Sequence, residues 1–446
     1  MTGASCKLIA GLAIALSVVF ACKASELTNA GPPTGQNRLP AARKAQSGKV
    51  YNVKQLGAKG DGVANDTAAI QKTINAAPDG STIYFPAGTY DVSNLQVKSR
   101  SGLSFIGEGR NSVIKQKTGA QRIATFTNSR DIVITKLSFD ANGIKSYGGV
   151  VFYAVTGVQI ENNSFVDSAP KPIASTDRYS FVFAKGSQPS RDIKILNNVI
   201  EDLQLEVNHS RRVVIEGNTV SRAVKTAGIG IFTVGHNAIA EDYLIKGNEI
   251  IDPPGAGFSV GIDPPTSRNC VFRWITIINN RVIRTKTAGF GIRIGTPDSS
   301  KASTGNVFED IVVKDNLFQI GTTAPASREV IFANTSAKSG ISFDRLTVAG
   351  NTIENHGPIN QGFAIDLRGV QNSIIADNTV KGVGSGIALT GPLANDVRNN
   401  VVEASAIAYR FDSSRGKNRA ANNRILGNPR QGWRLSNMKP SDSIEQ

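Results

Sequence analysis

The chain has 446 residues, which is long enough for one large domain with a single core or for two to three ordinary domains. Hydrophobic residues make up 40% of it, which excludes an intrinsically disordered chain, and its three cysteines exclude a disulfide scaffold and a cysteine-based zinc module. The 50 Lys and Arg outnumber the 35 Asp and Glu, and the resulting net charge of +15 favours a polyanionic partner: nucleic acid, an acidic polysaccharide or an anionic membrane surface.

Residues 1–21 are predicted to be a signal peptide. Lys7 precedes an apolar run over residues 8–21, which has the length of an export signal and is short for a membrane span. The run ends Val19-Phe20-Ala21-Cys22, which resembles a bacterial lipobox and predicts lipidation of Cys22; a plain secretory signal, cut for instance after Ala24, is the alternative. Either signal predicts an exported protein, periplasmic, extracellular or anchored to the outer membrane of a bacterium. Nucleic acid is then not expected as a partner, and membrane contact is limited to the lipid anchor.

Two short segments follow the signal. Residues 22–48 are rich in Gly and Pro and are predicted to be a flexible tether. Asp66 is a candidate helix N-cap, and Ile70 and Ile74 follow with the i, i+4 spacing of a helix that buries one face. We therefore predict a short helix over residues 66–77.

One pattern recurs along the rest of the chain: branched apolar residues at alternate positions, then Asn, then another apolar pair. The recurring asparagines are Asn163, Asn198, Asn218, Asn248, Asn280, Asn316, Asn351, Asn378, Asn400 and Asn423. Their spacing varies from 20 to 36 residues, which argues against an α-solenoid with its more uniform repeats. Short strands separated by Gly and Asn turns instead fit the coils of a parallel β-helix.

We therefore predict an all-β fold: a single-stranded right-handed parallel β-helix over residues 49–428, capped at its N-terminal end by the helix. The hand follows from the strong preference of parallel strand crossovers for right-handed connections. Each recurring Asn is expected to take up a left-handed backbone at a corner and to hydrogen-bond its counterpart in the next coil, about 4.8 Å away. Residues 429–446 are predicted to be a C-terminal tail.

The N-terminal part of the predicted solenoid carries a specific resemblance. Tyr51 to Gln71 reads YNVKQLGAKGDGVANDTAAIQ, and Ser81 to Tyr90 reads STIYFPAGTY. Both stretches resemble the opening of the pectate lyase superfamily, which polygalacturonase-type glycoside hydrolases, mannuronan epimerases and phage tailspikes share. The resemblance covers residues 51–114 and implies a right-handed β-helix that acts on a polysaccharide, often one containing uronic acids.

Two later stretches are similar to active-site motifs of that superfamily. Residues 257–261 and 291–296 resemble consecutive active-site coils of polygalacturonases, but Ala256 stands where those enzymes have His and Gly295 where they have Lys. Only Arg293 carries over. Asp263-Pro264-Pro265 resembles the Asp-Pro-His of mannuronan epimerases without the His. The sequence therefore holds no complete catalytic motif of one enzyme branch.

The outward side chains of one long strand per coil form the surface on which we expect chemistry. An Arg there can neutralise the carboxylate of a uronate and so acidify the neighbouring C–H, and a carboxylate, Arg or His can then move the proton. When these strands are aligned coil by coil, four such residues fall on four consecutive coils of one face. The predicted catalytic residues are Arg293, Asp263, His236 and Glu206.

The same alignment predicts spacings. Arg293 and Asp263 are expected one coil apart and about two residues offset, which places their Cα atoms about 8 Å apart. Glu206 and Asp263 are expected about 12 Å apart, which is too far for the carboxylate pair of a retaining glycosidase. Phe290 and Phe363 are expected among the inward positions.

Four further residues are predicted to contact substrate: Asn208 and His209 at the end of the Glu206 strand, and Asp366 and Arg368 further along the column. The alternative is that these charged groups are an ordinary solvated surface and that the histidines are turn residues. No metal site is predicted. A Gly-Asp-Gly turn and a helix cap account for Asp61 and Asp66 better than a calcium loop does.

Together these features predict an exported lyase or glycoside hydrolase that acts on an acidic, uronic-acid-containing polysaccharide. A non-catalytic glycan-binding or cell-surface scaffold protein and a mannuronan-type C5-epimerase are the alternatives. No cofactor is predicted, since calcium is compatible with the sequence but not indicated by it. The sequence leaves the oligomeric state open.

Overall fold

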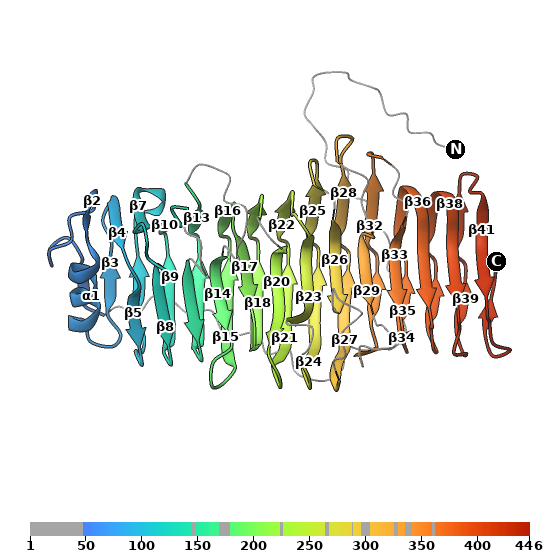
Figure 1. The fold of residues 1–446 in the computed structure, drawn as a ribbon, viewed down its shortest axis with the longest axis horizontal. Coiled ribbons are helices and arrows are strands. Elements are labelled where there is room, and N and C mark those ends of the chain that lie inside the picture. The colour runs from blue at the N-terminus through green and yellow to red at the C-terminus, as the bar shows by residue number, and fades with distance from the viewer. Residues whose placement is uncertain are drawn as a thin grey trace, which may run out of the picture. The chain divides into compact units, whose positions relative to one another are not determined.

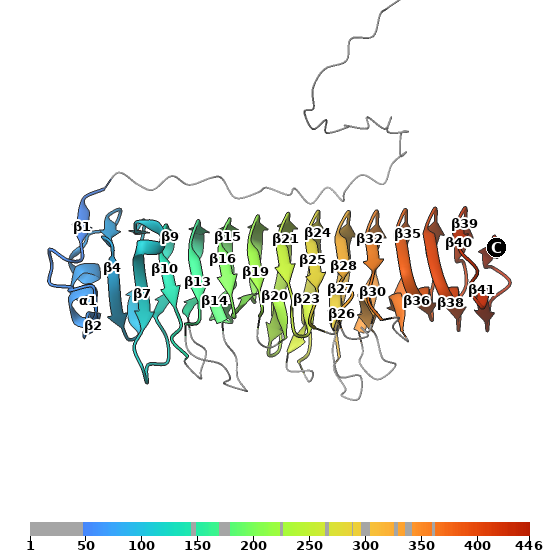
Figure 2. The same cartoon turned by 90° about the horizontal axis from the view of Figure 1, so that it is seen from above.

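The computed structural model of the chain describes residues 48–143, 149–168, 179–223, 226–263, 267–287, 289–295, 304–324, 329–334, 341–358 and 362–446. The predicted signal peptide and Cys22 lie outside these residues, as does the predicted tether apart from Gly48. Within them, parallel strands form a 17-stranded and a 25-stranded sheet. Strands of successive coils lie side by side along one axis (Figures 1 and 2), which confirms the predicted right-handed parallel β-helix.

Each central coil contributes one strand to each of three rows. Row 1 contains β5 (Leu95–Lys98), β8 (Ala124–Thr127), β11 (Val150–Tyr153), β14 (Tyr179–Ala184), β17 (Gln204–Val207), β20 (Ala227–Val234), β23 (Ala256–Asp263), β26 (Phe290–Gly295), β29 (Ile331–Asn334) and β33 (Phe363–Arg368). Row 2 includes β12 (Thr156–Glu161), β15 (Ser190–Leu196), β18 (Ser210–Glu216), β21 (Ile239–Lys246), β24 (Val271–Ile278) and β27 (Asn306–Lys314). Row 3 includes β13 (Ser164–Val166), β16 (Val199–Glu201), β19 (Thr219–Ser221), β22 (Glu249–Ile251), β25 (Arg281–Arg284), β28 (Leu317–Ile320) and β32 (Thr352–Asn355). The longer strands β36 (Thr379–Thr390) and β38 (Val401–Asp412) run through rows 3 and 1.

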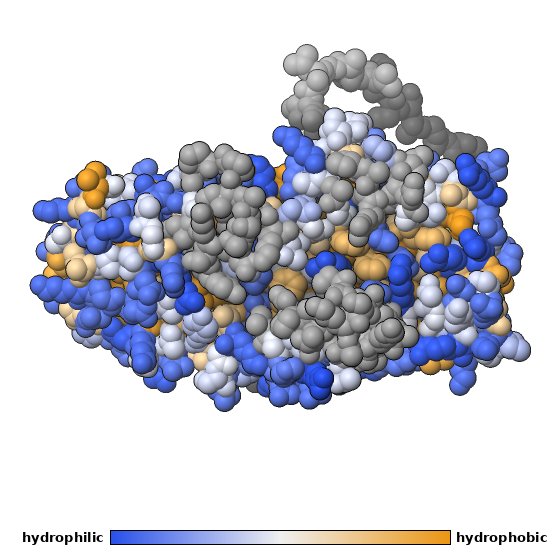
Figure 3. All heavy atoms as spheres, in the orientation of Figure 1, coloured by the Kyte–Doolittle hydropathy of each residue, from blue (hydrophilic) through white to orange (hydrophobic). Residues whose placement is uncertain are grey.

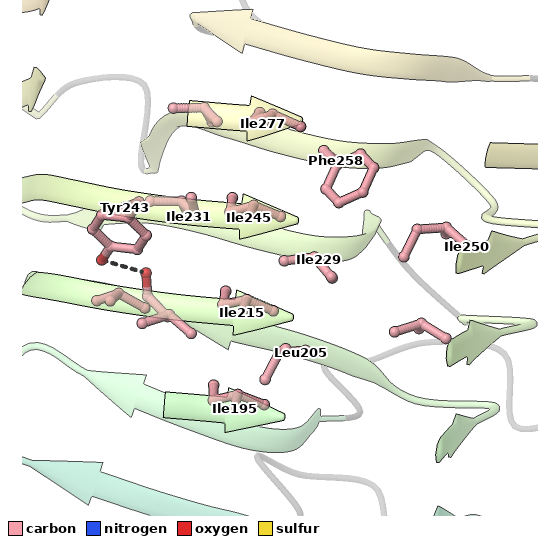
Figure 4. Packing of buried hydrophobic residues seen from close by; sticks show 14 of the residues in the cluster. Ile195, Leu205, Ile215, Ile229, Ile231, Tyr243, Ile245, Ile250, Phe258 and Ile277 are labelled. Carbon is pink, nitrogen blue, oxygen red and sulfur yellow. Dashed lines mark hydrogen bonds between the residues drawn. The ribbon is translucent and has the colours of Figure 1, made fainter. Parts of the chain in front are cut away.

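The core is the interior of the coils, where like residues stack on like. In row 2, Ile195, Ile215, Ile245 and Ile277 form one stack, and each is at most 1% exposed (Figure 4). Burial of each such side chain stabilises the fold by about 2 kcal/mol. The Tyr243 hydroxyl donates a hydrogen bond to the Val207 carbonyl at 3.1 Å, so this one polar atom of the interior is satisfied.

The recurring asparagines form the predicted ladder. In each step the Nδ2 of one Asn donates to the Oδ1 of the next, from Asn163 to Asn198 at 3.1 Å and so on to Asn423. The left-handed backbone, however, lies one residue earlier, for example at Asn162 (φ 56°) and Asn279 (φ 54°). The chain needs one left-handed residue to turn each corner, and the ladder Asn must keep its amide aimed along the axis, so the preceding residue takes that conformation.

The predicted capping helix is α1 (Thr67–Ala76), at the N-terminal end of the solenoid in Figure 1, with Ile70 and Ile74 buried. Asp66 precedes it but does not cap it with its side chain. The Asp66 carboxylate accepts hydrogen bonds from the backbone N–H groups of Lys59 (2.6 Å) and Gly60 (3.0 Å), so it fixes the preceding loop. No helix among the described residues is long and apolar enough to cross a membrane.

The expected C-terminal tail is instead part of the solenoid. Strand β41 (Gln431–Ser436) pairs with β38, and β42 (Ser443–Ile444) pairs with β39 (Arg419–Ala421). Trp433 stacks on Tyr409 with ring centroids 4.5 Å apart. This coil lacks a ladder Asn after Asn423, which is why the sequence pattern ended too early.

Candidate functional site

Pairing register along row 1 aligns the outward side chains in one column. Its central members are Glu206, Gly230, Ser259, Arg293, Phe332 and Asp366. The structure therefore places three of the predicted site residues, Glu206, Arg293 and Asp366, on one line that follows the axis of the solenoid.

Asp263 does not lie beside Arg293. Arg293 pairs with Ser259, whereas Asp263 lies four residues further along β23 and pairs with Val234. One coil and four residues of strand rise place the Cα atoms of Arg293 and Asp263 about 14 Å apart, and the same offset places Glu206 and Asp263 about 16 Å apart. The predicted distances of about 8 and 12 Å were wrong, because a shift of two residues leaves the alternation of inward and outward side chains unchanged.

Glu206 is brought together with Asn208, but in a closed arrangement. Its Oε1 accepts from Gln204 Nε2 at 2.8 Å and its Oε2 from Asn208 Nδ2 at 3.0 Å. Gly230 leaves space for the ring of Phe232, since a Cβ at Gly230 would lie 2.4 Å from Cε2 of Phe232 and 3.3 Å from Cγ of Glu206. Glu206 is only 8% exposed, so its carboxylate is buried near the ring of Phe232 and is held there by the side-chain amides of Gln204 and Asn208.

Further along the column, arginines and phenylalanines gather on the outer surface. The guanidinium carbon of Arg293 lies 5.8 Å from the ring centre of Phe290, and the Phe290 and Phe332 rings stack at 5.3 Å. We call the following set the arginine–aromatic face: Phe290, Arg293, Phe332, Phe363, Asp366, Arg368 and Arg410. Figure 3 shows apolar surface over β26 to β33 beside strongly hydrophilic side chains. Such a surface offers rings to the apolar side of a sugar and guanidinium groups to its carboxylate.

Asp366 is the buried anion of this face. Its Oδ2 accepts from Arg368 Nη2 at 2.6 Å, and its Oδ1 lies 3.9 Å from Arg410 Nη2. The side chain of Asp366 is 3% exposed, against 41% for Arg368 and 26% for Arg410. The hydrogen bond from Arg368 to Asp366, with the charges of Asp366 and Glu329, raises the pKa of Arg368. Asp366 therefore positions two guanidinium groups that reach solvent.

Sequence reasoning missed Phe332, Glu329 and Arg410, and placed Phe290 and Phe363 on the wrong side. Both phenylalanines lie outside the hydrophobic core cluster. The cause is visible at Gly291, where a Cβ would lie 2.4 Å from Cδ1 of the buried Phe318. Gly291 and Ile292 therefore both face inward at a corner, which reverses the alternation and turns Phe290 outward. In the sequence, a small residue directly after each Phe, Gly291 or Ala364, could have indicated that the Phe points outward.

His209 and His236 lie off the column. They follow β17 and β20, and with Lys185, Arg191 and Arg211 they line a hollow of about 430 Å³. Burial, together with the charges of Lys185 and Arg211, lowers the pKa of His209 to about 4. The predicted sharing of one face by His236 and Arg293 is therefore not found.

The described residues contain no group of three or more His, Cys, Asp or Glu side chains that could hold a metal ion. At the turn considered for calcium, Asp61 Oδ1 accepts hydrogen bonds from the N–H groups of Val63 at 3.0 Å and Ala64 at 2.8 Å. With Asp66 bound to its own loop, both carboxylates are occupied by backbone donors.

Sequence comparison relates part of this solenoid, residues 50–283, to a family of pectate lyase-like proteins; the arginine–aromatic face lies beyond the matched residues. The model of the family described as "Rhamnogalacturonase A/epimerase, pectate lyase-like" matches residues 50–283. Mannuronan C5-epimerase AlgE2 of Azotobacter vinelandii is 35% identical over 116 residues, 22% of this chain and 12% of that protein. Exo-poly-alpha-D-galacturonosidase of Dickeya chrysanthemi is 47% identical over 58 residues, 13% of this chain and 10% of that protein. The matches thus span about a tenth of the length of these curated relatives.

Comparison with solved structures supports the fold. The Streptococcus pneumoniae surface protein and adhesin PfbA superposes with a TM-score of 0.56 at 17% identity, over 88% of this chain and 100% of that chain. The Yersinia enterocolitica family 28 exopolygalacturonase superposes with a TM-score of 0.50 at 12% identity, over 89% of this chain and 78% of that chain. At these identities the likeness concerns the parallel β-helix alone.

Proposed function

The chain belongs to the rhamnogalacturonase A/epimerase family of pectate lyase-like proteins, and from this premise we propose that it is a lyase or glycoside hydrolase acting on an acidic, uronic-acid-containing polysaccharide. The arginine–aromatic face carries the proposal. Arg293, Arg368 and Arg410 spread positive charge over four steps of coil stacking, roughly 19 Å, on one side of the solenoid. Guanidinium groups pair with carboxylates, so this line fits several successive uronates of one polymer.

The carboxylates of the face favour elimination over hydrolysis. Hydrolysis needs two accessible carboxyl groups that flank the glycosidic bond. Asp366 is buried beneath its arginines, whereas Glu329, two residues before β29, is partly exposed and near enough to Arg368 for its charge to act on it. We assign Glu329 as the proton acceptor and Arg293 as the group that neutralises the uronate carboxylate. In elimination the base takes the proton next to that carboxylate, and the freed electron pair forms a C=C bond. The glycosidic C–O bond breaks, and the leaving sugar oxygen keeps its electron pair and takes up a proton from water.

The test is incubation of the full chain with polygalacturonate and with alginate. Unsaturated, ultraviolet-absorbing ends identify a lyase, and new reducing ends without them identify a hydrolase. Arg293→Ala and Glu329→Gln should each lower turnover at least a hundredfold, the usual scale for loss of a general acid or base. Lys72→Ala, which removes one exposed charge from α1, is the matched control and should leave turnover unchanged.

Two results would count against the proposal. No new ends with any acidic polymer would favour the non-catalytic glycan-binding alternative. Altered NMR signals at constant chain length would instead identify an epimerase, which abstracts the same proton but returns one to the opposite side of the sugar.

A further inference from the structure

A second basic site lies at the ends of three row 1 strands, two or more coils before the arginine–aromatic face. Lys185, His209 and His236 follow β14, β17 and β20 at successive turns, and they line the 430 Å³ hollow together with Arg191 and Arg211 of row 2. This volume falls within the range of small-molecule pockets. No carboxylate belongs to its lining within the described part of the chain.

Among the described residues, Glu241 is the one carboxylate that forms an ion pair with a cation of this pocket, and its partner there is Arg211. In the row 2 ladder, Arg191 lies directly beside Arg211 on one side and beside Thr156 on the other. Arg211 shares Glu241, at 2.9 Å, with Arg273 of the following coil, so that carboxylate already serves two guanidinium groups. Two like charges one coil apart repel, and a bound anion would remove the repulsion.

The two histidines add neutral donors. His209 Nδ1 accepts the N–H of Ile239 at 3.1 Å, and His236 Nδ1 accepts the N–H of Arg268 at 3.1 Å. A neutral imidazole whose Nδ1 accepts a hydrogen bond carries its proton on Nε2. Each ring therefore has an Nε2–H left to donate. The Lys185 ammonium donates to the carbonyl of His236, which ties the lysine to the same turn.

We propose that this pocket is a second anion-binding site, which takes the oxyanion group of one acidic sugar unit, a carboxylate or a sulfate ester, between Arg191, Lys185 and the Nε2–H groups of His209 and His236. It is separate from the arginine–aromatic face and does not depend on the chemistry proposed there. Charge-assisted hydrogen bonds from Lys and Arg supply the affinity, and the imidazole donors supply direction.

The three histidines of the chain make a sharp test possible. In protein labelled with ¹⁵N at histidine, titration with sodium sulfate or with digalacturonate should shift the side-chain resonances of His209 and His236. His356 follows β32, four coils beyond β19, which belongs to the coil of His236, and so lies roughly 19 Å along the axis from that coil; it should not shift. A shift with both probes marks a general oxyanion site, and tighter binding of digalacturonate marks a uronate site; both support the proposal.

The variant that tests the site combines Arg191→Gln with Lys185→Met. Lys72→Ala, which removes one positive charge elsewhere on the chain, is the control. The double variant should weaken binding at least tenfold, and the control should not change it. His209 and His236 do not belong to the arginine–aromatic face, so turnover of polymer tests the proposed function separately from anion binding in this pocket. Absence of shifts at both histidines, an equal shift at His356, or unchanged affinity in the double variant would overturn the proposal.

Discussion

At the residue scale, the central feature is a buried carboxylate that holds surface arginines. Asp366→Asn keeps the shape but removes the charge that Arg368 and Arg410 share. We expect a loss of about 1–2 kcal/mol in the free energy of unfolding, less than for a fully buried pair because both arginines reach solvent. We also expect at least tenfold weaker retention on polygalacturonate, since the guanidinium groups lose their fixed positions.

Asp396→Asn is the control for that measurement. Asp396 accepts from Arg398 at 3.1 Å across the same two-residue spacing, but this pair is 34% and 26% exposed. A surface pair contributes about 0.5 kcal/mol, and no change in polymer binding is expected. Equal effects of the two substitutions would show that Asp366 has no special positioning role.

His209 predicts a dependence of stability on pH. Its pKa is about 4 in the folded chain, below the ordinary 6.5, so the unfolded chain takes up the proton first as the pH falls. Neutral His209 therefore contributes its full share to the free energy of unfolding above about pH 6.5, and this contribution is lost as the pH falls toward 4. We expect the loss to be about 1–2 kcal/mol, a value reduced because the pocket is open to solvent. His209→Asn suits the left-handed backbone there, with a φ of 45°. Urea midpoints at pH 7 and pH 4.5 should differ less in this variant than in the parent chain.

At the element scale, the asparagine ladder joins the coils. Asn280 Nδ2 donates to Asn316 Oδ1 at 3.0 Å and to the Ile245 carbonyl at 2.9 Å. Its Oδ1 accepts hydrogen bonds from the backbone N–H and from the Nδ2 of Asn248. Asn280→Ala leaves several buried polar groups unpaired and should lower the free energy of unfolding by about 3 kcal/mol. Asn423→Ala at the half-buried end of the ladder should cost about 1 kcal/mol, because water can replace the lost partners. Equal costs in urea unfolding would contradict this account.

At the scale of the whole molecule, the two ends of the solenoid need covers. Strand β41 pairs with β38 and lays Trp433 over Tyr409, so ending the chain at residue 428 would expose the β38 edge and an aromatic surface. We expect this truncated chain to self-associate in size-exclusion chromatography with light scattering. Removal of residues 443–446 alone, which deletes only β42, should leave the association state unchanged. A truncated chain that behaves like the parent would mean that the last coil is dispensable as a cover.

The sequence by itself determined the β-helix, the asparagine ladder and the helix at the N-terminal end, because these follow from local periodicity repeated in every coil. It also identified Arg293, Asp366 and Arg368 as outward residues by alternation. Only the tertiary structure decided the register that moved Asp263 away from Arg293, the corner at Gly291 that turned Phe290 outward, and the burial of Glu206. The physical reason is that coil lengths vary, so the residues that meet on one face are set by stacking between coils, and period-two alternation carries no information about a shift of two.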